Sequence, residues 1–261
     1  MMNIKLSNED KRNDILVHIR EISELDVCLF VDTGFEKMGN VSMGNLLDKL
    51  GYNWISVNRR RKNGGIGFMV KKGLGAEGIK HVNPNVLWLK IDKDPPLFIG
   101  GVYRSPTTNF DDTMTELKGE IAKRLEEGNV IILGDFNARI GEEPSVVNAV
   151  DVEETEDRRT VFPRKSQDKN KNREGMELLN TMNALNMVIL NGISGTAEFT
   201  CHQPRGSSVI DLACVDARIL VCSSQFTVWD DEWSVDLSDH SLVSFDLDIP
   251  PSPPVTAVAM S

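Results

Sequence analysis

The chain has 261 residues, a formal net charge of −10, 40% hydrophobic residues and 26% charged residues. This composition is ordinary for a soluble globular protein, and the length fits one large domain. The sequence has no run of about 18 apolar residues and no signal-peptide stretch at its start. We therefore expect an intracellular protein with no membrane partner, in which the four cysteines, none in CxxC spacing, stay reduced.

Helix-like and strand-like segments alternate along the first half of the chain. Apolar residues at helical spacing predict helices over 8–24, 42–50 and 110–128. Short apolar runs between turn residues predict strands over 26–31, 63–73, 86–91, 97–103 and 129–136. The strands 86–91 and 97–103 are expected to form a hairpin, and the continuous apolar run of 129–136 indicates a strand buried on both faces.

The second half opens with a polar segment, 141–173, which has little periodicity and is interpreted as a long surface excursion, partly mobile. A helix is expected over 174–186, and strands over 187–191, 207–216, 225–229 and 241–249. A single domain over 1–249 would then be followed by a proline-rich tail or linker, 250–261. The pattern predicts an α/β fold in which two mixed sheets pack face to face with helices outside.

The negative net charge argues against broad adhesion to nucleic acid, because such adhesion needs positive charge to neutralise phosphates. It does not exclude a nuclease, since a local basic patch or bound cations can supply that charge. Two basic clusters are present, RRRK at 59–62 and the stretch 158–173. Each is either such a patch or a solvated loop.

Three segments place acidic or amide side chains directly at the end of an apolar strand: IILGDFNA (131–138), SVIDLACVD (208–216) and LSDHSLVSFDL (237–247). Strand ends hold side chains at fixed places, so they suit a preorganised site. Asp135 and Asn137 are two residues apart on an extended chain and therefore share a face.

This inventory suits metal-dependent cleavage of a phosphodiester. Carboxylate oxygens favour Mg²⁺ or Mn²⁺. A histidine oriented by a carboxylate, such as His240, can move a proton or bind a phosphate. The sequence has no GxxxxGK[ST] loop, GxSxG elbow or HExxH helix, so the commoner alternatives lack support.

GDFNA, the IDL at 210–212 and SDH at 238–240, in this order, resemble the motifs of the endonuclease/exonuclease/phosphatase superfamily. VYRSP (102–106) and NGGIGFMVKKG (63–73) resemble two further segments of that family, and the resemblance covers nearly the whole chain. The sequences of these motifs are most similar to those of the apurinic/apyrimidinic-type endonuclease domains of LINE-like (non-LTR) retrotransposons. The resemblance implies a DNase I-like, four-layered α/β-sandwich and a Mg²⁺- or Mn²⁺-dependent endonuclease that nicks one DNA strand at a target site.

The resemblance also implies roles for individual residues. Asp135 would orient or deprotonate the attacking water, and Asn137 would hold that water and a phosphate oxygen. His240, oriented by Asp211, would bind or protonate the phosphoryl group. Tyr103 would donate a hydrogen bond to the phosphate.

The implied metal ligands are Asp32, Asp239 and Asn3. The family normally has a glutamate in a pattern like LQET, whereas LFVDT puts the shorter Asp32 at that place. A ligand one methylene shorter would shift the ion by about an ångström, and such a shift can cost on the order of 10²-fold in rate. Only Met1 and Met2 precede Asn3, so the first strand would be clipped. Both departures imply reduced activity.

Three further residues lie where phosphate or DNA contacts would be expected: Arg104, Thr200 and His202. Arg104 could equally solvate a strand end, and the other two could equally belong to a hairpin loop. GDFN alone could be a β-turn, and His240 alone could be a structural histidine.

Two other functions remain open on sequence grounds. One is a phosphatase or phosphodiesterase of the same fold acting on a small phosphorylated substrate, which the negative net charge favours. The other is a catalytically impaired nucleic-acid-binding module. For a retroelement endonuclease the expected substrate is DNA, the expected partner a reverse transcriptase fused after the tail, and the expected compartment the nucleus.

Overall fold

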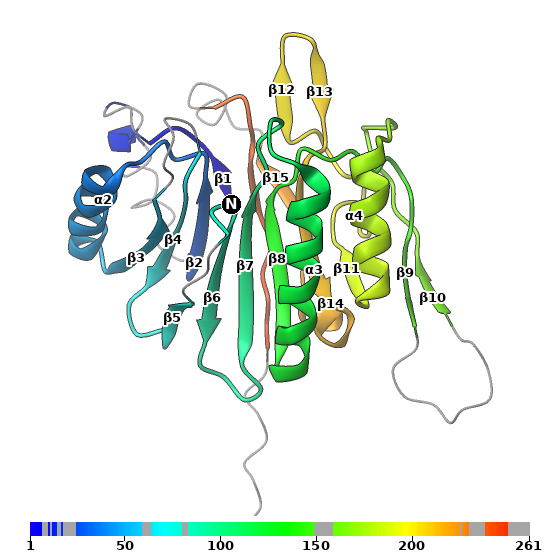
Figure 1. The fold of residues 1–261 in the computed structure, drawn as a ribbon, viewed down its shortest axis with the longest axis horizontal. Coiled ribbons are helices and arrows are strands. Elements are labelled where there is room, and N and C mark those ends of the chain that lie inside the picture. The colour runs from blue at the N-terminus through cyan, green and yellow to red at the C-terminus, as the bar shows by residue number, and fades with distance from the viewer. Residues whose placement is uncertain are drawn as a thin grey trace, which may run out of the picture.

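The protein is described by a computed structural model over residues 1–6, 10, 12–14, 17, 25–58, 64–79, 83–148, 159–224, 226–229 and 238–249. Two β-sheets form its centre, with helices on their outer faces (Figure 1). The helix expected over 8–24 lies largely outside the described residues, and the RRRK cluster at 59–62 and the tail 250–261 lie wholly outside them.

The larger sheet has six strands in the order β11-β14-β8-β7-β6-β5. Their bounds are β5 (Ala76–Ile79), β6 (Val86–Ile91), β7 (Leu97–Tyr103), β8 (Asn129–Asp135), β11 (Met187–Ile189) and β14 (Asp211–Asp216). β7 and β8 pair in parallel, and the other neighbours are antiparallel. The predicted hairpin of β6 and β7 is confirmed, as is the interior position of the apolar strand β8.

The smaller sheet has four strands in the order β1-β2-β4-β3. Their bounds are β1 (Met2–Asn3), β2 (Val27–Val31), β3 (Tyr52–Val57) and β4 (Ile66–Lys71). The antiparallel pair β15 (Thr227–Trp229) and β16 (Leu242–Ser244) continues this sheet beyond β1. The Met1 ammonium donates to Val243 O at 2.6 Å, and Val243 N donates to Met1 O at 3.1 Å.

Three helices lie outside the sheets. α2 (Lys37–Lys49) packs beside β3, and α3 (Phe110–Glu127) and α4 (Arg173–Ala184) cover the six-stranded sheet (Figure 1). The side chains of Asn109 and Asn172 cap α3 and α4. α2 begins at Lys37 rather than at residue 42, because Gly39 allows its first turn to pack directly on Phe35. Among the described residues, no helix has the length and apolar content needed to cross a bilayer.

Apolar side chains form three layers. Trp88 and Ile132 belong to the layer under α3 and α4, Leu29 and Ile131 to the layer between the sheets, and Phe30 and Met43 to the layer under α2. Three apolar layers separate four layers of secondary structure, so the four-layered α/β-sandwich predicted from the sequence is confirmed.

The two sheets approach closely at a glycine of β7. A Cβ on Gly101 would lie 2.5 Å from Leu29 Cδ1 of the opposite sheet. The missing side chain therefore lets Leu29 of β2 pack directly against β7.

The segment 141–173 differs from the predicted surface excursion. Its described part contains the hairpin of β9 (Ser145–Asn148) and β10 (Arg159–Phe162), and it buries Arg164, Ser166 and Asp168. Arg164 donates to three backbone carbonyls, which ties the segment to the rest of the domain. Polar residues that are satisfied in the interior leave no apolar periodicity, so the sequence pattern did not reveal them.

The strand predicted over 207–216 is broken. β13 (Gly206–Ser208) pairs with β12 (Cys201–Gln203) in a hairpin, and β14 starts only at Asp211. Between them, side chains replace a strand partner: Asp168 accepts from Val209 N at 3.1 Å, and Thr200 Oγ1 accepts from Ile210 N at 3.1 Å.

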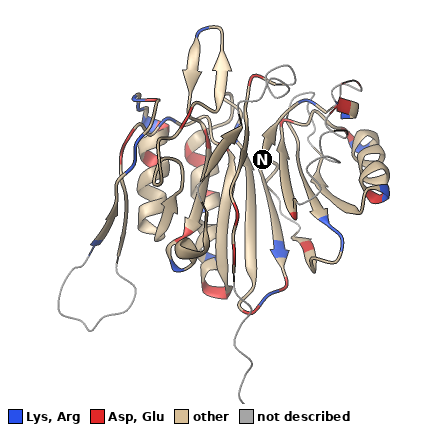
Figure 2. Cartoon of the chain, turned by 180° about the vertical axis from the view of Figure 1, so that it is seen from behind, with Lys and Arg blue, Asp and Glu red and all other residues tan. Residues whose placement is uncertain are grey.

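The basic stretch 158–173 does not form a free patch where it is described. Its ion pairs include Lys169–Glu142 at 2.6 Å, Lys171–Glu143 at 2.6 Å and Arg173–Asp111 at 3.1 Å. Figure 2 shows Lys and Arg interspersed with Asp and Glu along the described chain. Apart from the buried Arg164, the described basic residues Lys169, Lys171 and Arg173 therefore form a solvated, paired surface.

Candidate functional site

Three predicted site residues form a row across neighbouring strands of the larger sheet. Tyr103 at the end of β7 pairs in register with Asp135 at the end of β8, and Asp135 pairs with Asp211 at the start of β14. Residues paired in register point to the same face of a sheet. That face is turned toward the smaller sheet, because Tyr103 and Ile131 belong to the layer between the sheets.

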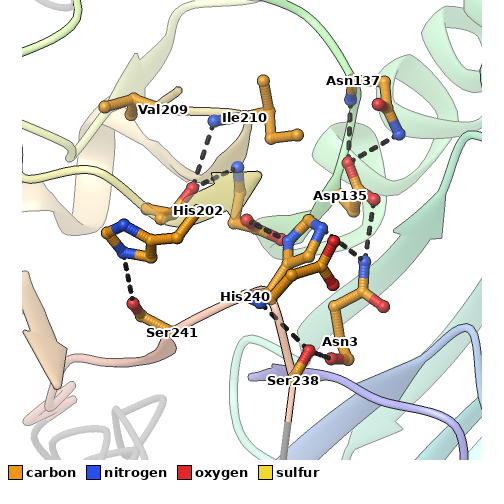
Figure 3. A network of polar contacts seen from close by, with 12 residues as sticks. Asn3, Asp135, Asn137, His202, Val209, Ile210, Ser238, His240 and Ser241 are labelled. Atoms are coloured by element: carbon orange, nitrogen blue, oxygen red, sulfur yellow. Dashed lines mark hydrogen bonds and ion pairs between the residues drawn. The ribbon is translucent and has the colours of Figure 1, made fainter. Parts of the chain in front are cut away.

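The smaller sheet supplies the opposite side of the site (Figure 3). Asn3, which ends β1, donates through Nδ2 to Asp135 Oδ2 at 2.9 Å, and the same Nδ2 lies 3.3 Å from His240 Nε2. Ser238 Oγ donates to Asn3 O at 2.5 Å and accepts from His240 N at 3.0 Å. The two ends of the sequence therefore meet at one buried network.

His240 and Asp211 form a buried pair. The distance from His240 Nδ1 to Asp211 Oδ2 is 2.8 Å, and the two residues are 9% and 0% exposed. Burial alone would lower the pKa of His240, but the Asp211 carboxylate outweighs burial and raises that pKa to about 12. The Asp211 carboxylate therefore favours the protonated form of His240.

Asp135 has the opposite shift. Burial, and after it the nearby charge of Asp211, raise the pKa of Asp135 to about 8, although the positive charge of His240 and a backbone hydrogen bond oppose the rise. Asn137 supplies that bond, N to Oδ1 at 2.9 Å, and adds its side-chain Nδ2 to the same oxygen at 3.0 Å. Asn137 has φ 48°, a left-handed conformation that asparagine tolerates better than most residues.

The backbone of Asp211 is fixed by two buried side chains. Thr200 Oγ1 accepts from Asp211 N at 3.1 Å, and Asn191 Nδ2 donates to Asp211 O at 3.0 Å. Among the described residues, Asp211 Oδ1 has no hydrogen-bond partner although it is buried. Asp135, Asp211 and His240 each offer a ligand atom within 4.8 Å of the others. An oxygen-rich cluster with an unused buried carboxylate oxygen fits a hard divalent cation.

Two further predicted metal ligands lie at the rim. Asp32 follows β2, is half-buried and accepts from Gly64 N through Oδ1 at 2.6 Å. Its charge contributes to the raised pKa of Asp135, behind burial, Asp211 and the other groups around that carboxyl. Asp239 is exposed, and its carboxylate lies within 4.8 Å of ligand atoms of His240 and Cys201.

The predicted phosphate- or DNA-contacting residues have different surroundings. Arg104 Nη1 donates to Asn137 O at 3.2 Å, and its guanidinium lies 5.2 Å from the centre of the Phe110 ring. His202 is exposed on β12, with Nε2 3.1 Å from Ser241 Oγ. Thr200 is 0% exposed and its hydroxyl serves two backbone N–H groups, so we correct its expected DNA contact to a positioning role.

Sequence reasoning missed Ser238 and Asn191 as parts of the site. Ser238 stands in the SDH motif beside two residues that were singled out, and Asn191 ends the apolar run MVILN. An amide at the end of an apolar strand is the same signal that identified Asn137, so Asn191 could have been found.

Neither a family model nor a curated protein matches this chain in sequence. Several solved structures share its fold. The endonuclease domain of TRAS1, a telomere-specific non-LTR retrotransposon, is 15% identical, with 95% of this chain and 96% of that chain covered and a TM-score of 0.64. The 3′-5′ exonuclease NExo from Neisseria meningitidis is 13% identical, with 95% and 98% covered and a TM-score of 0.68. The AP endonuclease LMAP from Leishmania major is 15% identical, with 95% and 86% covered and a TM-score of 0.66.

Proposed function

This chain has the fold of the endonuclease/exonuclease/phosphatase, or DNase I-like, superfamily. We propose that it is a divalent-metal-dependent phosphodiesterase that nicks one strand of DNA. One observation carries the proposal. Asn3, Asp135, Asp211 and His240, which come from both sheets, meet in a single buried hydrogen-bond network.

The charge states of this network suit phosphodiester hydrolysis. Protonated His240 would bind a phosphoryl oxygen and donate to it, and Asp211 would keep the imidazole charged and oriented. Asp135, whose pKa is raised to about 8, would orient the attacking water and accept its proton, since a general base works best with a pKa near the working pH. Asn137 would hold the same water, and Tyr103 would donate to the phosphate from the adjacent strand.

Asp32, Asp239 and Asn3 would hold the cation, helped by the unused oxygen of Asp211. A bound Mg²⁺ or Mn²⁺ would neutralise charge that develops on the phosphoryl and leaving oxygens. Asp32 uses Oδ1 to accept from Gly64 N, so a ligand role would fall to its other carboxylate oxygen, and its charge acts on Asp135.

DNA is the proposed substrate. The hairpin of β12 and β13 projects from the same end of the molecule as the site (Figure 1), and His202 lies on it. Arg104 borders the site through Asn137. Similarity to the TRAS1 domain supports the narrower proposal of a retrotransposon target-site nickase, fused to a reverse transcriptase and acting in the nucleus.

Supercoiled plasmid provides the test. Wild type with Mg²⁺ should convert it to nicked circles, and EDTA should stop the conversion. Asp135→Asn should reduce nicking by about 10²-fold or more. Asp92→Asn, at the exposed far end of the β6–β7 hairpin, should not change it. Equal nicking by wild type and Asp135→Asn would contradict the proposal.

Phosphate-ester hydrolysis is the second candidate. One structure of NExo is described as a 3′ phosphatase bound to product DNA hairpin, and the net charge of −10 suits a small substrate better than a long duplex. Release of phosphate from such esters without plasmid nicking would favour it. A folded protein that binds neither Mg²⁺ nor Mn²⁺ in calorimetry would instead favour an impaired binding module.

A further inference from the structure

Beside the oxygen-rich cluster lies a second group of ligand atoms with a different chemistry. Cys201 and His240 are partners in an isolated antiparallel β-bridge, so their side chains lie directly opposite each other. A hydrogen bond of 2.6 Å from His202 N to Asp239 O fixes the bridge. The Sγ of Cys201, a carboxylate oxygen of Asp239 and a ring nitrogen of His240 all lie within 4.8 Å of one another.

We propose that Cys201, Asp239 and His240 form a site for a thiophilic divalent cation such as Zn²⁺ or Cd²⁺, whose binding inhibits the enzyme. A thiolate, an imidazole and a carboxylate are the ligands that Zn²⁺ takes in proteins, and three protein ligands leave one position for water. Mg²⁺ has little affinity for a thiolate, so the site discriminates between the two ions. The inhibitory effect, unlike the binding, rests on the proposed function.

The surroundings of His240 are those of a metal ligand. Metal-bound histidines almost always donate their other ring N–H to a carboxylate or carbonyl, and His240 Nδ1 lies 2.8 Å from Asp211 Oδ2. Nε2 is then the ligating atom, and the ion would displace the Asn3 amide, which lies 3.3 Å from it. Binding would release the thiol proton of Cys201 and the Nε2 proton of His240 to the buffer, with no change in oxidation state.

Access is from the Asp239 side. Asp239 is exposed, whereas Cys201 and His240 are 1% and 9% exposed. An ion captured by Asp239 at the surface would thus meet the thiol and imidazole just beneath. Once bound, it would occupy the nitrogen that otherwise faces the phosphate, so the inhibition would be direct and reversible by chelation.

Cd²⁺ titration tests the binding without any need for activity. The full chain should take up one equivalent and develop a thiolate-to-Cd²⁺ charge-transfer band in the ultraviolet, which Zn²⁺ then removes by competition. Cys201→Ser should abolish the band and weaken Cd²⁺ binding by about tenfold or more. Cys222→Ser removes the half-buried thiol of the 3₁₀ helix Ala217–Cys222 and should leave the band intact. A band that survives Cys201→Ser, or one lost in Cys222→Ser, would overturn the site.

A plasmid assay tests the inhibition. With Mg²⁺ in large excess, Zn²⁺ at about ten times its dissociation constant should reduce wild-type nicking by about tenfold. Cys201→Ser should need about tenfold more Zn²⁺ for the same loss, each rate being taken relative to the same variant without Zn²⁺. Zn²⁺ binding with unchanged nicking would overturn the inhibitory part. If no variant nicks DNA, the proposed function fails, and the Cd²⁺ titration still decides whether the site exists.

Discussion

Asp135 and Asp211 face each other directly across the antiparallel pair β8–β14. Two carboxylates at this spacing repel when both are charged, and only one of them has a histidine partner. The two carboxyl groups therefore differ in their surroundings: Asp211 contacts His240, whereas the pKa of Asp135 is raised to about 8. A strongly raised pKa beside a specific charged partner is typical of functional sites.

Asp211→Asn should show how the Asp211 carboxylate acts on His240 and on Asp135. Without the Asp211 carboxylate, the pKa of His240 should fall, and the pKa of Asp135 should fall as well because a like charge has gone. Nicking should decrease by about 10²-fold or more. NMR titration measures the pKa of His240, and single-turnover kinetics measure the rate of nicking.

Asp216→Asn is the matched control for that experiment. Asp216 is also buried on β14, but it lies at the other end of the strand and pairs with Arg218. It should affect stability and leave the pKa of His240 unchanged. If the pKa of His240 in Asp211→Asn equals that of the wild type, the 2.8 Å contact with Asp211 is not what raises it.

Asn137 provides a test that separates backbone strain from the loss of a functional group. Its φ of 48° is costly for alanine, by about 1–2 kcal/mol, but not for glycine. The free energy of unfolding, measured with urea, should therefore be lower for Asn137→Ala than for Asn137→Gly by about that amount. Nicking should fall in both, since both lose the amide bonded to Asp135. Equal stabilities would indicate that the loop relaxes.

Thr200 should act through its hydroxyl. Thr200→Val keeps the shape but leaves two buried N–H groups, those of Ile210 and Asp211, without their acceptor. An unsatisfied buried donor costs about 1–3 kcal/mol, so Thr200→Val should destabilise the protein by at least that much. Thr200→Ser should stay near wild type in both melting temperature and nicking. A destabilised Thr200→Ser would mean that the methyl group, rather than the hydroxyl, is what matters.

Asp168 makes stability depend on pH in a defined direction. Burial alone would raise the pKa of Asp168, but hydrogen bonds from Arg139, at 2.8 and 2.6 Å, and from the backbone N–H groups of Val209 and Asn170 hold that pKa below its usual value. A lowered folded pKa stabilises the protein fully above the unfolded pKa of about 4, and the benefit is lost as the pH falls through the folded value.

The stability advantage of wild type over Asp168→Asn should therefore be constant from about pH 5 to 7 and shrink toward pH 3. Urea unfolding at several pH values measures it. Asp14→Asn, which removes an exposed carboxyl, serves as the matched control. An advantage that grows on acidification would contradict the assigned direction.

The sequence revealed which side chains lie at the strand ends of the site, but not the residues that hold those side chains in place. Asp135, Asp211 and His240 could be found because each follows or precedes an apolar run, and an apolar run in this fold ends at the site. The β6–β7 hairpin and the helices α3 and α4 could be found because their periodicity and caps are local. The DNA-binding hypothesis for Thr200 failed because burial of a polar side chain depends on distant partners.

The parts of the fold that were missed have physical reasons of the same kind. By contrast, β1 is the short first strand ending at Asn3 that the resemblance implied, and its two residues pair with partners on both sides. The break before β14 comes from side-chain acceptors at positions 168 and 200, remote in sequence. Asn191 and Ser238 act through a single amide and a single hydroxyl, which leave no composition signal.

Asn3 and His240 touch across 237 positions of sequence. Closing so long a loop is entropically expensive, and the contact depends on β16, whose Val243 bonds to Met1 beside β1. A chain still emerging from the ribosome therefore has both carboxylates of β8 and β14 but no finished site. The contact between Asn3 and His240 therefore exists only after the segments around both residues have been synthesised and have packed together.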